Sequence, residues 1–291
     1  MLKQILLLLF IITSFTYATS KNIDKEIPSI VDTKWLKSNI NNPNLVILDL
    51  RDEKSYKKEH ISNSINIPAL ENLFADKYFM PDIESLKKLF SDAGIKENSS
   101  VLAYDDGSFI WSARLYWILE ILGHDNVGIL NVGYNNWDKN YISVDDKIYT
   151  PSKTNFIPRV DNEKVQTKLS TLLSIGKKTI IDGRKESHYL GKESLAKRHG
   201  HIPTAKNYAC TQNYQVTSTG NKIKNLEELK ELYKDIPKDK KIILYCDGGA
   251  EAALNYIVLQ ELGYKASVYD GSWIEWGNDV NVPIDNPSNK N

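Results

Sequence analysis

Short apolar runs alternate along the chain with segments of helical period. Near the C-terminus the apolar run 242–245 predicts a buried strand, and the run 250–262 predicts a helix. Cys246, Gly248 and Gly249 lie between these two elements. A cysteine there would lie at a helix N-terminus, where unpaired backbone N–H groups favour an anion. This position predicts a thiol that loses its proton easily and acts as a nucleophile, although a small buried residue also fits it.

The same order of elements occurs twice in the chain. In the first half we expect a strand within 40–50, a helix over 83–90, a strand over 101–104, a helix over 111–122 and a strand over 127–130. In the second half we expect a strand over 179–181, a helix over 226–233, the strand and helix around Cys246, and a strand over 266–269. This alternation predicts the α/β class, with two tandem domains that each have a mostly parallel sheet flanked by helices.

The predicted limits of the two domains follow from the repeat. We expect the first domain over 28–144 and the second over 161–284. Residues 145–160, which include Pro151 and Pro158, have little periodicity and are interpreted as a linker.

The first 18 residues have the pattern of a secretory signal peptide. Lys3 is followed by an apolar run that is too short to span a bilayer, and small and polar residues lead to Ala18. We therefore expect cleavage after residue 18 and a periplasmic or secreted protein with no membrane span, with an uncleaved anchor as the alternative. An exported protein with a reactive cysteine would need a reducing thiol partner.

Composition and charge exclude several classes of protein. Lys plus Arg and Asp plus Glu both total 37, so no basic face indicates nucleic-acid binding. The 2 cysteines do not form a disulfide scaffold. The 5 histidines and the cysteines show no spacing typical of metal ligands, and we expect no metal.

The repeat separates architecture from chemistry, because a feature found in both halves is expected to be structural. Such features are Asp49 with Arg51, Asp182 with Arg184, Tyr134 with Trp137, and Trp273 with Trp276. Cys246 occurs once, and its counterpart in the first half is Asp105. This asymmetry makes Cys246 the candidate catalytic residue.

Three segments resemble the tandem rhodaneses, the family of thiosulfate and 3-mercaptopyruvate sulfurtransferases. They are residues 268–276 (VYDGSWIEW), residues 200–207 (GHIPTAKN, with Thr204 where the family has Gly), and residues 104–114 together with Gly123-His124. The resemblance covers nearly all of the chain after residue 18. It implies two rhodanese domains, of which only the second has an active loop.

The resemblance also implies a mechanism. Cys246 would take the outer sulfur of a small donor, become a persulfide, and pass the sulfur to a thiophilic acceptor such as cyanide or a thiol. Backbone N–H groups of the loop would hold the charged sulfur without an organic cofactor. The loop residues are Asp247, Gly248, Gly249, Ala250, Glu251 and Ala252.

The loop departs from both known types of the family. Relatives that use thiosulfate place Arg and Lys after the cysteine, and those that use mercaptopyruvate place Gly and Ser, whereas this chain has Asp247 and Gly248. Asp247 and Glu251 should raise the pKa of the thiol unless they point away or pair. Glu251 also fits a simple interaction with the helix dipole. His188 and Arg198 match substrate-binding positions of the family, and His188 also fits a solvated loop residue.

Three other functions compete with sulfur transfer. A Cys-loop phosphatase needs an arginine six residues after the cysteine, and Ala252 at that position argues against it. A non-catalytic module would bind sulfide, persulfide or a partner protein. An exported thiol-redox protein would pair Cys210 with Cys246, whereas Cys210 otherwise fits a small core residue.

Overall fold

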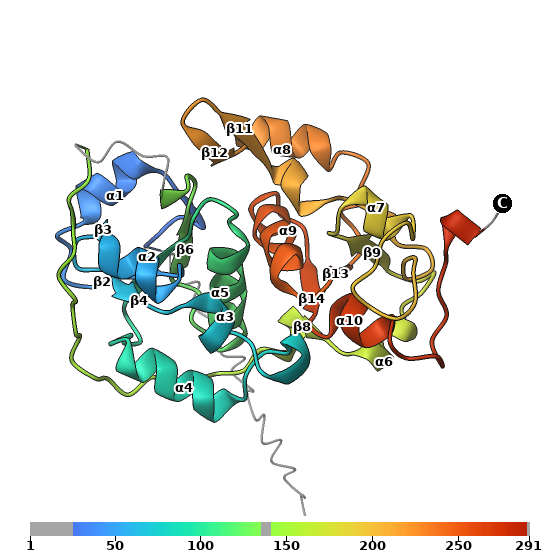
Figure 1. The fold of residues 1–291 in the computed structure, drawn as a ribbon, viewed down its shortest axis with the longest axis horizontal. Coiled ribbons are helices and arrows are strands. Elements are labelled where there is room, and N and C mark those ends of the chain that lie inside the picture. The colour runs from blue at the N-terminus through green and yellow to red at the C-terminus, as the bar shows by residue number, and fades with distance from the viewer. Residues whose placement is uncertain (1–25, 135–140, 290–291) are drawn as a thin grey trace, which may run out of the picture.

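The computed structural model describes residues 26–134 and 141–289 and shows two α/β units that lie side by side (Figure 1). The prediction of two tandem domains with parallel sheets is confirmed. The exact domain limits, 28–144 and 161–284 with a linker over 145–160, stay predictions. The predicted signal peptide, 1–18, and Trp137 lie outside the described residues. Within the described ranges no helix has the length and apolar character that crossing a membrane requires.

The first unit is built on a 5-stranded parallel sheet in the order β1-β6-β5-β2-β4. Its strands are β1 (Ile30–Val31), β2 (Leu45–Asp49), β4 (Ile65–Asn66), β5 (Ser100–Tyr104) and β6 (Val127–Leu130). Its helices are α1 (Thr33–Asn39), α2 (Glu53–Lys58), α3 (Ala69–Asn72), α4 (Ile83–Asp92) and α5 (Ile110–Ile121), with the 3₁₀ helix η1 (Asp76–Tyr78). The short strands β3 (His60–Ile61) and β7 (Val144–Asp145) pair beside the sheet. Every residue of β5 is buried, because helices cover both faces.

The second unit repeats this plan with the order β10-β9-β13-β14-β8, again parallel. Its strands are β8 (Val165–Gln166), β9 (Thr179–Asp182), β10 (Lys206–Asn207), β13 (Ile242–Tyr245) and β14 (Ala266–Tyr269). Its helices are α6 (Lys168–Leu172), α7 (Glu186–Tyr189), α8 (Leu226–Leu232), α9 (Ala250–Glu261) and α10 (Ser272–Trp276). The 3₁₀ helices are η3 (Asn162–Lys164), η4 (Cys210–Asn213) and η5 (Pro287–Asn289), and β11 (Tyr214–Thr217) and β12 (Gly220–Ile223) form a hairpin.

Helices α5 and α9 hold the two units together (Figure 1). Both helices are apolar around most of their circumference, which is the pattern of a helix buried on all sides. Glu120 of α5 accepts a hydrogen bond from the hydroxyl of Tyr256 in α9 at 2.6 Å. Because α5 and α9 follow β5 and β13 directly, each N-terminus lies at the carboxyl edge of its sheet.

A buried ion pair at the end of the first long strand stiffens each unit. Arg51 pairs with Asp49 at 2.5 Å, and the hydroxyl of Tyr104 donates to the same carboxylate at 2.6 Å. The second unit repeats these contacts with Asp182, Arg184 and Tyr245, at 2.5 and 2.7 Å. The ring of Tyr134 covers the guanidinium of Arg51, and Trp273 covers that of Arg184. The prediction that Asp49 with Arg51 and Asp182 with Arg184 form a structural network at the strand ends is confirmed.

Candidate active site

The loop between β13 and α9 turns its backbone toward Cys246, whose side chain is 1% exposed. Gly249 is the N-cap of α9 and has a φ of 81°, a conformation that favours glycine. Its N–H donates to Cys246 Sγ at 3.0 Å. The backbone N–H groups of Ala252 and Gly248 also act on the sulfur and lower its pKa. The loop therefore presents several N–H groups to one buried sulfur atom.

The acidity of Cys246 differs from the initial expectation. A helix N-terminus should lower the pKa of a thiol, yet burial, followed by the charge of Glu251, raises the pKa of Cys246 to about 12. Asp247 raises this pKa as well. The correction has a simple cause, because desolvation of the thiolate and two nearby carboxylates outweigh the backbone N–H groups. Glu251 and Asp247 thus raise the pKa of the thiol, as the sequence predicted.

Glu251 lies in the first turn of α9, near the end of the loop that follows Cys246. Burial, together with the charges of Asp247 and Asp182, raises the pKa of its carboxyl to about 7, whereas Arg184 acts in the opposite direction. A carboxyl with this pKa gains and loses its proton near neutrality. The charge beside Cys246 therefore changes over the same pH range.

Asp247 is held by groups from α7 and from the end of β9. Its Oδ2 atom makes a hydrogen bond with His188 Nδ1 at 2.9 Å, and its Oδ1 atom lies 3.8 Å from Arg184 Nη1. The other ring nitrogen of His188 lies 3.4 Å from a carboxylate oxygen of Glu193. His188 is 7% exposed, so it is not a solvated loop residue. The structure thus brings His188 to the loop through Asp247.

Arg198 is placed differently from the sequence expectation. Its guanidinium donates to the carbonyl oxygens of Trp276 and Val282 at 2.9 Å each, and to those of Gly277 and Asp279. None of these partners belongs to the loop, so the side chain ties down the segment after α10. The position of Arg198 in space could not be judged by counting along the irregular segment before Gly200.

Cys210 lies in η4, 3% exposed, and its N–H donates to the carbonyl oxygen of Gly183 at 2.8 Å. Burial raises the pKa of its thiol, and the charges of Glu251 and Cys246 raise it further. Cys210 is therefore a neighbour of the loop. Both cysteines are free thiols.

In the first unit Asp105 takes the place of the cysteine. Its carboxylate accepts hydrogen bonds from the N–H groups of Gly107 and Phe109 at 2.9 and 3.0 Å, and from the N–H and the hydroxyl of Ser112 at 3.1 Å each. The backbone of the first loop thus holds a carboxylate where the second loop holds a sulfur. A carboxylate in this position cannot carry sulfur, so we expect the first unit to be catalytically silent.

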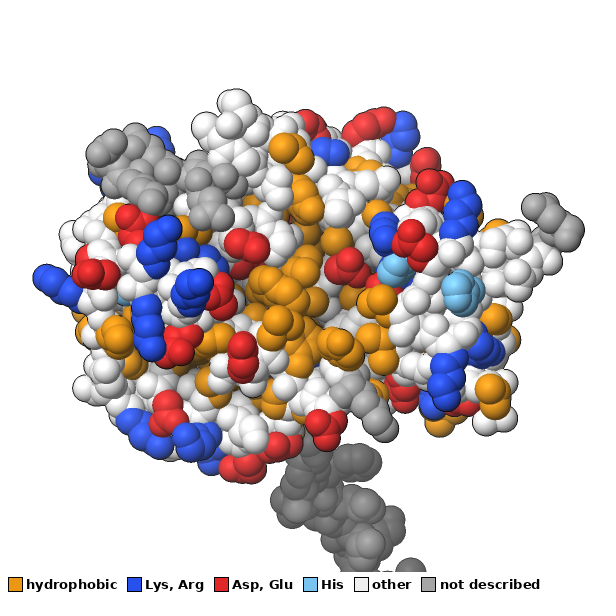
Figure 2. Space-filling view, viewed as in Figure 1, with side chains coloured by type: hydrophobic (Ala, Val, Ile, Leu, Met, Phe, Trp, Pro, Cys, Tyr) orange, Lys and Arg blue, Asp and Glu red, His pale blue; other side chains and the backbone are white. Residues whose placement is uncertain are grey.

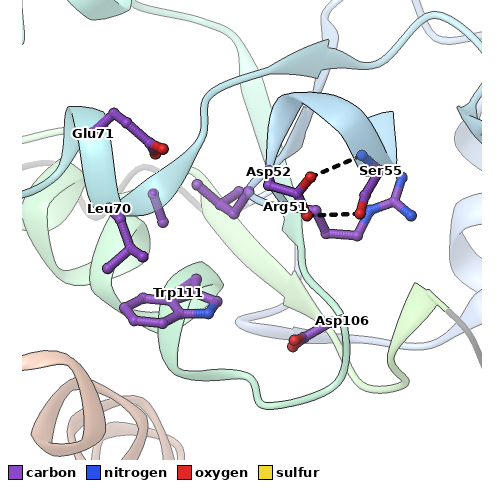
Figure 3. Close-up of a pocket in the computed structure, with 9 residues that line it drawn as sticks. Arg51, Asp52, Ser55, Leu70, Glu71, Asp106 and Trp111 are labelled. Atoms are coloured by element: carbon purple, nitrogen blue, oxygen red, sulfur yellow. Dashed lines mark hydrogen bonds between the residues drawn. The ribbon is translucent and has the colours of Figure 1, made fainter. Parts of the chain in front are cut away.

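A cavity of about 370 Å³ lies beside this first loop (Figure 3). It is lined by residues that include Arg51, Ser55, Asp106 and Trp111, together with Leu70 and Glu71 of α3. When the strand ends of the two units are matched, Arg51, Ser55 and Asp106 correspond to Arg184, His188 and Asp247. When the starts of α5 and α9 are matched, Trp111 corresponds to Glu251. The cavity is therefore the silent counterpart of the site around Cys246, with an indole ring in place of the titrating carboxyl.

Comparison with known proteins agrees with this geometry. The model of the rhodanese-like domain matches residues 32–140 and 165–279. A putative thiosulfate sulfurtransferase of Synechococcus elongatus is 31% identical over 86% of this chain and 83% of its own length. A thiosulfate sulfurtransferase of Corynebacterium glutamicum is 30% identical over 89% of this chain and 91% of its own length. The chain belongs to the rhodanese family.

Solved structures show the same fold. The crystal structure of SseA from Escherichia coli, described as a 3-mercaptopyruvate sulfotransferase, has a TM-score of 0.75 and 24% identity, and the match covers 85% of this chain and 99% of SseA. The anaerobic ergothioneine biosynthesis enzyme of Chlorobium limicola, solved with trimethyl histidine, has a TM-score of 0.78 and 21% identity over 89% of this chain and 70% of that one.

The charge of Glu251 gives a testable pH dependence. Glu251→Gln removes a negative charge beside Cys246, so we expect the pKa of the thiol to fall by up to about one unit. At pH 8, where the wild-type carboxyl is ionised, alkylation of Cys246 by iodoacetamide should be about three- to tenfold faster. Below pH 6 the wild-type carboxyl is protonated, and the two rates should converge.

The rates should be measured in a Cys210→Ser background, so that only Cys246 reacts. Glu261→Gln, at an exposed position near the end of the same helix, is the matched control and should leave the rate unchanged. Equal rates for Glu251→Gln and wild type at pH 8 would show that this carboxyl does not act on the sulfur.

Proposed function

We propose that the protein is a sulfurtransferase that carries sulfane sulfur on Cys246. The observation that supports this function best is the hydrogen bond of 3.0 Å from the Gly249 N–H to Cys246 Sγ, at the N-terminus of α9. A persulfide at this position is an anion, and backbone N–H groups and the helix dipole stabilise it. The names of the similar proteins point to the same chemistry.

The proposed cycle has two steps. The Cys246 thiolate attacks the outer sulfur of the donor, and the bond to that sulfur breaks with its electron pair leaving on the donor. When the donor is thiosulfate, the leaving group is sulfite. When the donor is 3-mercaptopyruvate, the leaving group is the enolate of pyruvate, which takes up a proton. Cyanide or a thiol then attacks the outer sulfur of the persulfide, and the thiolate of Cys246 is released. The cycle needs no cofactor, and Asp105 takes no part in it.

The charges of the loop affect which sulfur donor can bind. Thiosulfate carries two negative charges, and relatives that use it place basic side chains after the cysteine. Here Asp247 and the uncharged Gly248 occupy those positions, and the titrating Glu251 lies three residues further along the loop. Asp247 in turn contacts His188 and Arg184. A donor with less negative charge, such as 3-mercaptopyruvate, is repelled less, so we propose it as the better of the two.

A non-catalytic binding module is the second candidate, because the pKa of Cys246 is raised to about 12 instead of lowered. In such a module the loop would bind sulfide or persulfide without turnover. We further propose that the mature protein works outside the cytoplasm, after removal of residues 1–18, where a reducing thiol partner keeps Cys246 reduced.

The persulfide can be tested by intact mass spectrometry of the reduced protein, before and after 3-mercaptopyruvate and, separately, thiosulfate. We expect a gain of one sulfur atom that is lost when cyanide or a thiol is added. Cys246→Ser should abolish both the gain and the turnover. Cys210→Ser should retain both, because Cys210 carries no sulfur in the proposed cycle.

Each other outcome identifies a different function. No gain of sulfur with either donor, in protein shown to contain free Cys246, would favour the binding module. A loss of two hydrogen atoms would indicate a Cys210–Cys246 disulfide and a redox protein. Turnover that persists in Cys246→Ser would contradict the proposed mechanism.

The role of the acidic loop can be tested by Asp247→Arg. Replacing a negative by a positive charge should attract the thiosulfate dianion and raise kcat/KM for this donor about tenfold. Asp239→Arg makes the same change of charge at an exposed position outside the loop and serves as the control at equal ionic strength. An unchanged kcat/KM in Asp247→Arg would place donor binding elsewhere.

The proposed location can be tested by expressing the whole chain in a bacterium that has a periplasm. We expect the protein in the periplasmic fraction, with an intact mass that corresponds to residues 19–291. A cytoplasmic protein that retains residues 1–18 would contradict the prediction of a cleaved signal peptide.

A further inference from the structure

Arg114 connects the silent unit to the candidate active site. It lies in α5 with a side chain that is 0% exposed, and its Nη1 atom donates to Asp270 Oδ1 in the second unit at 2.6 Å. The other oxygen of Asp270 accepts a hydrogen bond from the N–H of Met80 at 2.7 Å. A single carboxylate of the second unit thus binds two donors from the first.

The guanidinium of Arg114 lies directly against the loop. A Cβ atom at Gly249 would lie 2.5 Å from Arg114 Nη1, well inside the contact distance. At Gly248 a Cβ atom would lie 3.0 Å from Cβ of Tyr78, another residue of the first unit. The two glycines therefore allow the first unit to pack on the backbone of the loop. Gly249 is also the residue whose N–H contacts the sulfur.

The surroundings of Arg114 are unusual for a charge that serves only to join two domains. The rings of Phe74 and Trp117 lie 4.8 Å each from its Cζ atom. Among the described residues its Nε and Nη2 atoms have no hydrogen-bond partner. Buried donors without partners cost free energy, and an apolar side chain would join the units without this cost. Hydrophobic side chains do gather along this boundary in Figure 2. The guanidinium therefore needs another explanation.

We propose that Arg114 is a positioning residue for Cys246, which holds the peptide of Gly249 so that its N–H points at the sulfur. Its ion pair with Asp270 fixes one edge of the guanidinium, and the two rings fix its plane. The planar group can then support the loop when the sulfur becomes an anion. The silent unit thereby forms part of the catalytic machinery. The effect on sulfur transfer rests on the proposed function, whereas the effect on the reactivity of the thiol does not.

Two variants in the Cys210→Ser background test this role. Arg114→Met keeps the length of the side chain and removes its charge and donors. We expect alkylation of Cys246 by iodoacetamide at pH 8 to slow about tenfold, with a pH profile displaced upward by about one unit. Arg114→Lys keeps the ion pair with Asp270, but an ammonium group cannot also cover Gly249, so we expect a loss of about threefold. In both variants kcat for sulfur transfer should fall more than KM changes.

Arg51→Lys is the matched control, because Arg51 is another buried arginine of the same unit. It should lower the thermal midpoint and leave the alkylation rate of the folded protein unchanged. Wild-type rates and an unshifted pH profile in folded Arg114 variants would overturn the proposal and leave Arg114 a purely structural contact.

If circular dichroism shows Arg114→Met to be unfolded, the proposal is tested by Arg114→Lys alone. A wild-type alkylation rate and pH profile in that variant would overturn the proposal. If wild-type protein takes up no sulfur from any donor, the proposed function fails, and the alkylation rates still test Arg114.

Discussion

The structure of the site depends on one contact, the hydrogen bond from the Gly249 N–H to the sulfur of Cys246. Strand β13 carries the cysteine into the interior, and the positive φ of Gly249 turns the chain so that α9 begins directly above the sulfur. Helix α9 can begin there because it is buried along most of its length against α5. The arrangement of both units thus serves to place a few backbone N–H groups around one atom.

The charges around this atom oppose one another. Burial, Glu251 and Asp247 raise the pKa of the thiol to about 12, and the N–H groups act against them. A resting thiol of this kind is protected from oxidation, since the thiolate is the reactive form. The same carboxylates disfavour a donor with two negative charges. The acidic loop therefore acts on the reactivity of Cys246, and the donor preference proposed above follows from the same charges.

The two units show how one frame can support different roles. Each has the strand-end pair of Asp and Arg, and each has a loop whose N–H groups surround an acceptor. In the first unit the acceptor is the carboxylate of Asp105, which satisfies its loop with internal hydrogen bonds. The first unit nevertheless contacts the loop of Cys246, because Arg114 packs on Gly249 of the second unit.

The sequence by itself determined the long strands and helices, the duplication, the ion pairs at the strand ends and the loop after Cys246, because each follows from a local pattern or its repetition. It missed the two-residue strands, such as β1 and β8, since so short an element has no period. The tertiary structure decided that His188 reaches Asp247, that Arg198 ties down the C-terminal segment, and that Arg114 crosses to the loop. The tertiary structure also decided that the pKa of Cys246 is raised above the ordinary value of a thiol and not lowered. These properties depend on burial and on distances between segments far apart in the chain, which no local pattern contains.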